Sequence, residues 1–344
     1  MPALWIHISR GALMSNVISF MPQPLAGEHL LGAAARWYLM TGEKDKRVLF
    51  SLSDRLRQLS PKFIHHPMFD DVLLKYGSGL QREAALSEHT LLSYYAPLIK
   101  YDQLFAIVKQ QKHQWWSTSK KVTKNLHSPV EIAPFNSVLK FAGNWRWCAQ
   151  CTVEDSDSVG SPYWHVAHQI PSVIRCYKHR WNALSEKCQA CGFVVKDLKD
   201  TPLPPIQNSC YACGENIQPI EFTKSDALDW IENASFGLLK RGENLLSHSH
   251  NHIMQRGVQN YCSRVNSISG RNYIFVIEEI QQKFVRWVLS NGLDIFFNEP
   301  ETALSGKILD INVGAYQAKN WHPLSALFWL KFLGKPWPKL DAAA

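Results

Sequence analysis

The sequence lacks any long hydrophobic run. No apolar stretch approaches the roughly 20 residues that a membrane-spanning helix needs, and the best candidate, at 324–333, is interrupted by Lys331. The N-terminal residues also lack the charged and then apolar pattern of a secretory signal. We therefore expect a cytoplasmic protein that has no membrane partner.

The common catalytic motifs are missing as well. The sequence has no G-x-x-x-x-G-K-[ST] loop, no G-x-S-x-G turn, no H-E-x-x-H motif and no deaminase pattern. His250-Asn251-His252 are adjacent in sequence and so cannot converge on one metal as the residues of the nuclease motif with these letters do. His248, His250 and His252 are expected on a polar loop, with a metal site as the alternative. These absences predict a binding protein and not an enzyme, with a zinc-stabilised nuclease as the alternative.

Cysteine is absent from the first 147 residues and then concentrated. Seven of the eight cysteines fall between positions 148 and 213, and a reducing cytosol favours metal binding over disulfides for such a group. Together with one histidine they form half-sites in which two residues separate the two ligands, a spacing typical of structural zinc. The half-sites are Cys148/Cys151, Cys176/His179, Cys188/Cys191 and Cys210/Cys213.

Pairing the half-sites in chain order predicts two zinc ions. The first site would have three thiolates and one imidazole, and the second would have four thiolates. Four protein ligands leave no open position, so both sites should build structure and not catalyse. An interleaved pairing stays open, and His165 and His168 could compete with His179. Cys262 has no partner, and we expect it in the core.

Acidic residues are outnumbered by basic ones. The chain has 37 Lys and Arg against 29 Asp and Glu, a net charge of +8, which favours a polyanionic partner. The segment 109–124 has five lysines, two tryptophans and no acid, and it is either a strip that contacts a DNA backbone or a solvated connector. The DNA-contact candidates are Lys109, Lys112, Lys120, Lys121 and Lys124 in this strip, and Arg146, Arg175, Lys178 and Arg180 near the first metal site.

Hydrophobic periodicity predicts helices on both sides of the cysteine-rich region. Apolar positions recur at helical spacing in 28–40, 277–289 and 322–333, and shorter helices are expected near 48–59, 71–76 and 88–100. We therefore predict a mainly α, multi-domain helical protein with small zinc-ribbon-like β elements and a central double zinc-binding module. The expected divisions are an N-terminal extension at 1–21, a helical domain at 22–139, the zinc module at 140–220 and a C-terminal helical domain at 221–344.

Several short segments occur in the order of a known family pattern. They are Glu88-His89-Thr90-Leu91, Tyr94-Tyr95-Ala96-Pro97, Trp147-Cys148-Ala149-Gln150-Cys151, Pro162-Tyr163-Trp164-His165, His168-Gln169-Ile170-Pro171, Cys176-Tyr177-Lys178-His179 and His322-Pro323-Leu324. Together they resemble the TniQ/TnsD family, the target-selection proteins of heteromeric transposons. Ala149 and Tyr177 stand where the family usually has proline, and the chain is short at its C-terminus for a TnsD-like protein.

The resemblance implies a non-catalytic, sequence-specific DNA-binding protein of the bacterial cytoplasm that lies on the nucleoid when bound to its target. It would recognise an attachment site in double-stranded DNA and recruit the AAA+ regulator TnsC, which brings the transposase. The alternative within the family is an adaptor docked on a CRISPR Cascade complex. Leu30, Leu31, Trp37 and Tyr38 of the first helix are the expected ATPase contact, or else part of the core.

Overall fold

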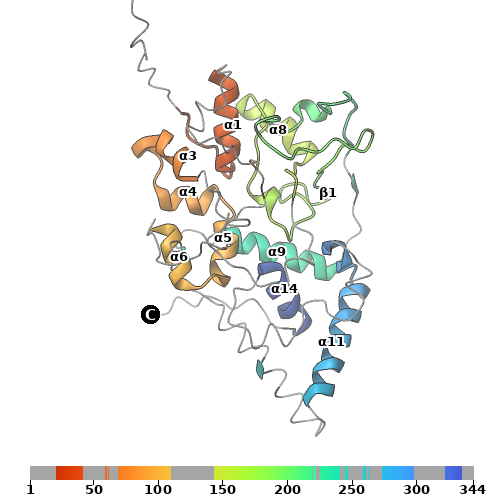
Figure 1. Cartoon of the computed structure of the whole chain (residues 1–344). Coiled ribbons are helices and arrows are strands. Elements are labelled where there is room, and N and C mark those ends of the chain that lie inside the picture. The colour runs from red at the N-terminus through yellow and green to blue at the C-terminus, as the bar shows by residue number, and fades with distance from the viewer. Residues whose placement is uncertain are drawn as a thin grey trace, which may run out of the picture.

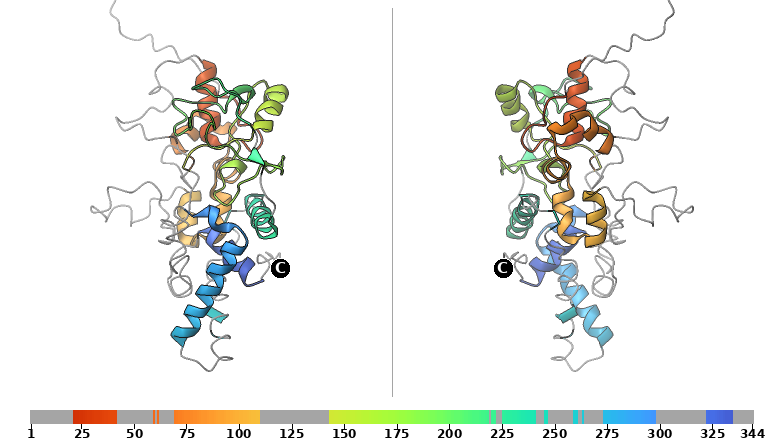
Figure 2. Two further views of the ribbon diagram at one scale, coloured as in Figure 1. Left: turned by 90° about the vertical axis from the view of Figure 1, so that its right-hand side faces the viewer. Right: turned by 90° about the vertical axis from the view of Figure 1, so that its left-hand side faces the viewer.

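The computed structural model describes residues 21–41, 69–109, 143–218, 225–240, 273–297 and 322–334, together with positions 59, 61, 220–221, 245–246, 259–260 and 263. Helices dominate these residues, which confirms the mainly α prediction. The N-terminal helices lie at one end of the molecule together with residues 143–221, which we call the metal-binding region because they contain the predicted zinc ligands (Figure 1). Helix α11 (Tyr273–Ser290) extends toward the other end (Figures 1 and 2). No described helix is long and apolar enough to cross a membrane.

The N-terminal region is built from short helices. They are α1 (Leu30–Thr41), α3 (Phe69–Tyr76), α4 (Arg82–Glu88), α5 (Leu92–Tyr95) and α6 (Tyr101–Val108). The helix expected over 88–100 is interrupted because Pro97 lies in the 3-10 turn after α5. The helix expected at 48–59 falls outside the described residues, apart from Leu59.

Helix α1 forms readily and lies close to the metal-binding region. Three successive alanines at 33–35 have the highest helix propensity of any residue type, and residues 30–37 are all buried. A glycine is required at position 32, because a Cβ there would come within 2.9 Å of the Trp164 Cβ atom. The backbone of α1 can therefore rest directly on this tryptophan.

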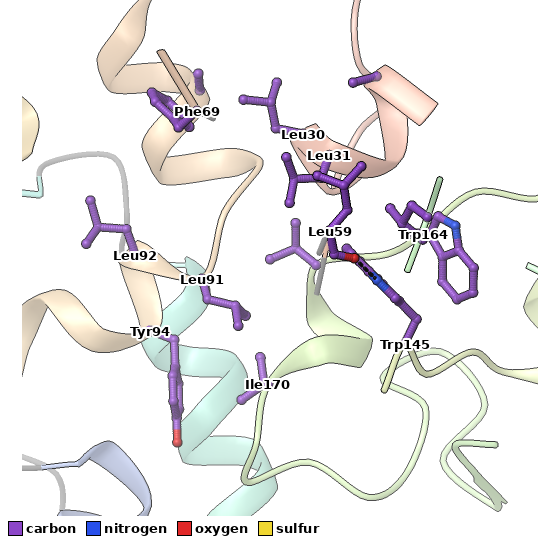
Figure 3. Packing of buried hydrophobic residues seen from close by; sticks show 14 of the residues in the cluster. Leu30, Leu31, Leu59, Phe69, Leu91, Leu92, Tyr94, Trp145, Trp164 and Ile170 are labelled. Carbon is purple, nitrogen blue, oxygen red and sulfur yellow. Dashed lines mark hydrogen bonds between the residues drawn. The ribbon is translucent and has the colours of Figure 1, made fainter. Parts of the chain in front are cut away.

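One hydrophobic core joins the N-terminal helices to the metal-binding region. Figure 3 shows Leu30, Leu91, Trp145 and Trp164 among the side chains of this core. The Trp145 side chain is fully buried, and its indole Nε1 donates a hydrogen bond to the Leu59 carbonyl at 2.7 Å. This bond gives the buried N–H a partner and so removes the cost of leaving it unpaired.

The metal-binding region contains one helix and otherwise short extended pieces. Helix α8 (Ala149–Val159) ends at Gly160, whose φ of 83° is the left-handed conformation that commonly closes a helix. The described β structure is an antiparallel pair, β1 (Asn182–Ala183) against β2 (Ile220–Glu221). Isolated bridges join Trp147 to Ser185 and Arg175 to Ala183. The predicted small β elements are therefore present.

The C-terminal helices form a second core. Helices α9 (Asp226–Lys240), α11 and α14 (Pro323–Phe332) pack around stacked aromatic rings, with the Phe284 and Trp329 centroids 4.1 Å apart. Pro323 occupies the first turn of α14, where its missing N–H costs nothing. Nδ1 of His322 accepts a hydrogen bond from the Leu324 N–H at 3.2 Å and so caps the helix. The predicted helix at 322–333 is confirmed.

A buried carboxylate joins the C-terminal helices to the metal-binding region. Glu232 of α9 is fully buried, and its Oε1 accepts from the backbone N–H groups of Ile174 and Arg175 at 2.9 and 2.8 Å. Its Oε2 accepts from the Arg175 guanidinium at 2.8 and 2.5 Å. Asp229, one turn earlier on α9, also pairs with Arg175. The carboxylate therefore holds both the backbone and the side chain that precede Cys176.

Two adjacent tyrosines of α5 tie the three regions together. The Tyr94 hydroxyl donates to Oγ of Ser172 at 2.9 Å, and Ser172 in turn bonds Ser235 of α9 at 2.6 Å. The Tyr95 hydroxyl lies 3.2 Å from Nε2 of His322 at the start of α14. All of these groups are buried, so each bond satisfies polar atoms that water cannot reach.

Replacing Glu232 by alanine should strongly destabilise the fold. The Arg175 guanidinium would stay buried without its main partner, and breaking a buried ion pair from one side costs roughly 3–5 kcal/mol. Asp229→Ala is the matched control and should cost less, because this carboxylate is 38% exposed and Arg175 would keep its buried partner Glu232. Urea unfolding followed by tryptophan fluorescence measures both values. Equal losses for the two variants would contradict the central role of Glu232.

Candidate metal centre

The first cluster brings together Cys148, Cys151, Cys176 and His179, all of them buried. Cys148 directly precedes α8 and Cys151 lies in its first turn, so this helix sets the geometry of one half-site. The other half-site is a turn in which the Asn182 N–H donates to the His179 carbonyl at 2.8 Å. The Cys151 and Cys176 sulfurs are 3.5 Å apart, and Nδ1 of His179 lies 3.4–3.6 Å from all three sulfurs.

These distances match the edges of a zinc tetrahedron. With Zn–S bonds of about 2.3 Å and a Zn–N bond of about 2.0–2.1 Å, tetrahedral angles place two sulfurs about 3.8 Å apart and the nitrogen about 3.5 Å from each sulfur. Thiolate and imidazole are also the ligands that zinc prefers. The cluster could therefore hold a zinc ion with every position filled by the protein.

A carboxylate orients the imidazole of this cluster. Oε1 of Glu154 on α8 lies 2.8 Å from Nε2 of His179, which fits a ring that carries its proton on Nε2 and turns the Nδ1 lone pair toward the sulfurs. His165, one of the two competing candidates, is engaged elsewhere. Its Nε2 lies 2.7 Å from Asp155 and its Nδ1 lies 3.1 Å from the Tyr177 hydroxyl.

The second cluster brings together the remaining half-site cysteines. Its members are Cys188, Cys191, Cys210 and Cys213. The sulfurs of Cys188 and Cys213 are 3.8 Å apart, and those of Cys191 and Cys210 are 3.7 Å apart. Both distances are close to the edge of about 3.8 Å expected between two zinc-bound thiolates. The half-sites therefore come together in chain order and not in the interleaved order.

The two halves of the second cluster are built in the same way. A glycine follows the second cysteine of each half-site, with φ of 75° at Gly192 and 77° at Gly214, a conformation that glycine adopts without strain. In each case the glycine N–H donates to the carbonyl of the first cysteine, at 3.0 and 2.8 Å respectively. Two equal tight turns thus point four sulfurs at one position.

The two clusters differ in their access to solvent. Every ligand of the first cluster is buried, whereas Cys191 and Cys213 of the second cluster are exposed. Cys148, Cys151 and Cys176 of the first cluster pack within the shared hydrophobic core, and Cys188 and Cys210 of the second cluster reach the same core. Reagents in solution therefore reach the second cluster more easily.

Two of the basic residues predicted to contact phosphates are internal. The Arg146 guanidinium is buried and donates to the carbonyls of Val173 and Ile170, both at 2.6 Å. Burial lowers the pKa of Arg146 to about 10, so the group stays charged at neutral pH and the carbonyls replace its water. Arg175 is 2% exposed and is held by Glu232. The DNA-contact prediction is wrong for Arg146 and Arg175, because neither side chain is accessible to a phosphate.

Lys178 and Arg180 reach the surface, but each has an acidic neighbour. Nζ of Lys178 lies 3.9 Å from Asp155, and the Arg180 guanidinium lies 3.5 Å from Glu232. Between the two basic residues, His179 belongs to the first cluster, so their backbone positions follow from the geometry of that site. Both residues remain candidates for contact with DNA.

The lysine strip is described only at its first residue. Lys109 is half-exposed and its Nζ lies 3.8 Å from Glu83. The other members of the strip and the remaining candidates fall outside the described residues: Lys112, Lys120, Lys121, Lys124, His248, His250, His252 and Cys262. Their predicted roles stay predictions.

The apolar residues predicted to contact the ATPase belong to the core. Leu30, Leu31 and Trp37 are buried, and Tyr38 packs partly buried against the same cluster. Leu30, Leu31 and Trp37 are therefore part of the core, which was the alternative interpretation of these residues, whereas Tyr38 keeps part of its surface and its predicted role stays a prediction. The exposed apolar residues of α1 are Leu39 and Met40, 51% and 68% exposed.

Sequence reasoning missed two acidic residues that support the first cluster, Glu154 and Glu232. Glu154 offers no local signal, because its partner His179 is distant in sequence. Glu232 does offer one, since it lies on the buried face of α9 with Leu228, Ile231 and Ser235. A charged residue on an otherwise apolar helical face indicates a buried partner.

Comparison with known proteins identifies a family region in this chain. The TniQ family model matches residues 19–182. The match includes all four ligands of the first cluster and stops before the second cluster begins at Cys188. No curated protein sequence gives a significant match.

The thiols of the second cluster should be modified before those of the first. During slow alkylation with iodoacetamide in the presence of a chelator, Cys191 and Cys213 should react first, because they alone among the cluster cysteines are exposed. Quenching at successive times and mapping the modified peptides by mass spectrometry gives the order. Modification of Cys148, Cys151 or Cys176 at the same rate would contradict the difference in access.

Proposed function

The chain is a TniQ/TnsD-like protein associated with transposition, and on this premise we propose that it selects target DNA for a transposon. In this proposal it binds an attachment site in double-stranded DNA and recruits the AAA+ regulator TnsC, which brings the transposase. The observation that carries the proposal is the family pattern of residues 19–182, folded around the first metal cluster. The protein itself is proposed to be non-catalytic.

Both clusters are proposed to bind structural zinc. Four protein ligands converge in each, so a bound ion has no open position for a substrate or a reactive water. In such sites the binding free energy of the metal is also folding free energy. Zinc would thus hold the backbone from residue 148 to residue 213 in place, a region that has little regular structure apart from α8.

Elemental analysis of the purified chain should find two zinc ions per molecule. Cys148→Ser should lower the zinc content toward one and lower the melting temperature, because a buried ligand of a closed site is lost. Cys191→Ser should remove the other zinc with a smaller fall in melting temperature, since its cluster lies at the surface. A content near one or zero in the unaltered chain would contradict the two-site proposal.

The distribution of charge indicates where DNA would bind. Residues 143–221 carry seven basic and eight acidic side chains, so the metal-binding region contributes none of the surplus. Residues 110–142 carry five lysines against one glutamate. We therefore assign the main phosphate contacts to Lys109, Lys112, Lys120, Lys121 and Lys124, with Lys178 and Arg180 as supporting contacts.

Gel shifts with an attachment-site duplex test this assignment. Replacing Lys120, Lys121 and Lys124 by alanine should weaken binding and make the salt dependence less steep, by about 0.9 in the log–log slope for each lost contact. Lys178→Ala with Arg180→Ala should have a smaller effect. Lys283→Ala with Arg286→Ala, exposed positions on α11, is the control.

An unchanged affinity and salt slope in the strip variant would contradict the assignment of phosphate contacts. Failure of the unaltered chain to bind the duplex, combined with binding to a purified Cascade complex, would replace target-site binding by the adaptor function. The two outcomes are distinct, because the first concerns the strip variant and the second the unaltered chain.

The N-terminal helices are proposed to contact the ATPase through residues other than those predicted from sequence. Leu39 and Met40 at the end of α1 are exposed, as is Leu74 on α3, which packs against α1. Exposed apolar side chains on adjacent elements are typical of protein interfaces. This surface is available without disturbing the core that Leu30 and Trp37 form.

Leu39→Asp with Met40→Asp should abolish retention of TnsC on target DNA and leave DNA binding and thermal stability unchanged. A buried charge at the interface would oppose docking, whereas both positions tolerate charge in the free protein because they face solvent. Leu289→Asp, an exposed leucine on α11, is the matched control. Pull-down of TnsC with the chain bound to immobilised duplex gives the result. Full retention by the double variant would contradict the placement.

A further inference from the structure

A fifth donor lies against the first cluster. His168, in the 3-10 turn η4 (Ala167–Gln169), is 1% exposed. Its Nε2 lies 3.4 Å from the Cys176 sulfur and 4.0 Å from the Cys151 sulfur. The cluster thus contains one more imidazole than a tetrahedral zinc site requires.

The geometry separates the roles of the two histidines. Nδ1 of His179 lies 3.4–3.6 Å from all three sulfurs, which is the position of the fourth vertex. Nε2 of His168 is close to Cys176 and more distant from Cys151, so it lies beside one edge of the tetrahedron. At 3.4 Å its N–H can donate a hydrogen bond to the Cys176 sulfur.

The position of His168 is fixed by its neighbours. The side chain of Gln169 bonds both backbone atoms of Arg146, accepting from its N–H at 3.0 Å and donating to its carbonyl at 2.8 Å. Arg146 lies two residues before Cys148, so η4 is tied to the chain that enters the cluster. The His168 ring also packs against the rings of His165 and Tyr177, with centroids 4.6 and 5.6 Å away.

We propose that His168 is a positioning residue of the first metal site that donates its Nε2–H to the Cys176 thiolate and slows the loss of the metal. The proposal rests on the proposed binding of zinc. Three thiolates and one imidazole leave the zinc complex with a net negative charge, and an N–H donor stabilises the thiolate that carries part of it. Glu154 orients the nitrogen ligand, and His168 serves one of the sulfur ligands in the same way.

Release of zinc from the full chain tests the proposal. Excess chelator should remove the metal in a fast phase from the exposed second cluster and a slow phase from the first. His168→Leu and His168→Met, which lack a donor, should accelerate the slow phase about tenfold or more, in line with the effect of other residues that orient metal ligands. His168→Gln should restore part of the retention, because its amide can donate. His89→Gln, a buried histidine bonded to the Glu28 carbonyl, is the control.

The cobalt(II)-substituted protein gives a second measurement. Without the donor, the thiolate-to-cobalt charge-transfer band should shift, while the bands of the tetrahedral centre stay in place because His179 remains bound. Loss of the tetrahedral bands would show that His168 is a ligand and would overturn the proposal. The proposal would also be overturned if His168→Leu and His168→Met left both the slow phase of zinc release and the cobalt spectrum unchanged. An unaltered chain without zinc would instead overturn the zinc proposal itself.

Discussion

The buried carboxylate of Glu232 connects the two halves of this protein. Because it accepts from consecutive backbone N–H groups and from the Arg175 side chain, α9 and the second half-site of the first cluster fix each other's position. Removing one partner of a buried ion pair costs several kcal/mol, so the packing of α9 and the conformation of the turn that leads into Cys176 stabilise each other.

The segments that carry the family pattern also form the contacts between regions. His89 accepts from the Leu30 N–H through its carbonyl and bonds the Glu28 carbonyl through its ring. Tyr94 and Tyr95 reach the metal-binding region and α14. These residues are buried polar groups with specific partners, so replacing one of them by a side chain that lacks the donor or acceptor leaves an unsatisfied atom in the interior.

The parts that were predictable from the sequence are those that local spacing determines. Two-residue gaps placed the cysteines in half-sites, and apolar periodicity found the longer helices. The exposure of the basic side chains was not predictable from the sequence. Arg175 is covered by α9, whereas Lys178 lies near Asp155 and reaches solvent, and both neighbours come from other parts of the chain. The same reason explains why Leu30 and Trp37 were assigned to a partner surface. Helical spacing shows that these apolar side chains lie on α1, but only the tertiary structure shows whether neighbouring elements or a partner cover them.

The distance in sequence between Arg175 and Glu232 also sets an order of events during synthesis. All four ligands of the first cluster leave the ribosome before residue 180, whereas the carboxylate that neutralises Arg175 follows more than fifty residues later. Until α9 emerges, the guanidinium must remain hydrated, so the nascent cluster has its ligands but cannot bury the turn beside it. The C-terminal helices thus supply the last buried contact of a site whose ligands all lie upstream of them, and any chain that ends before α9 has the metal ligands but not the carboxylate that lets Arg175 be buried.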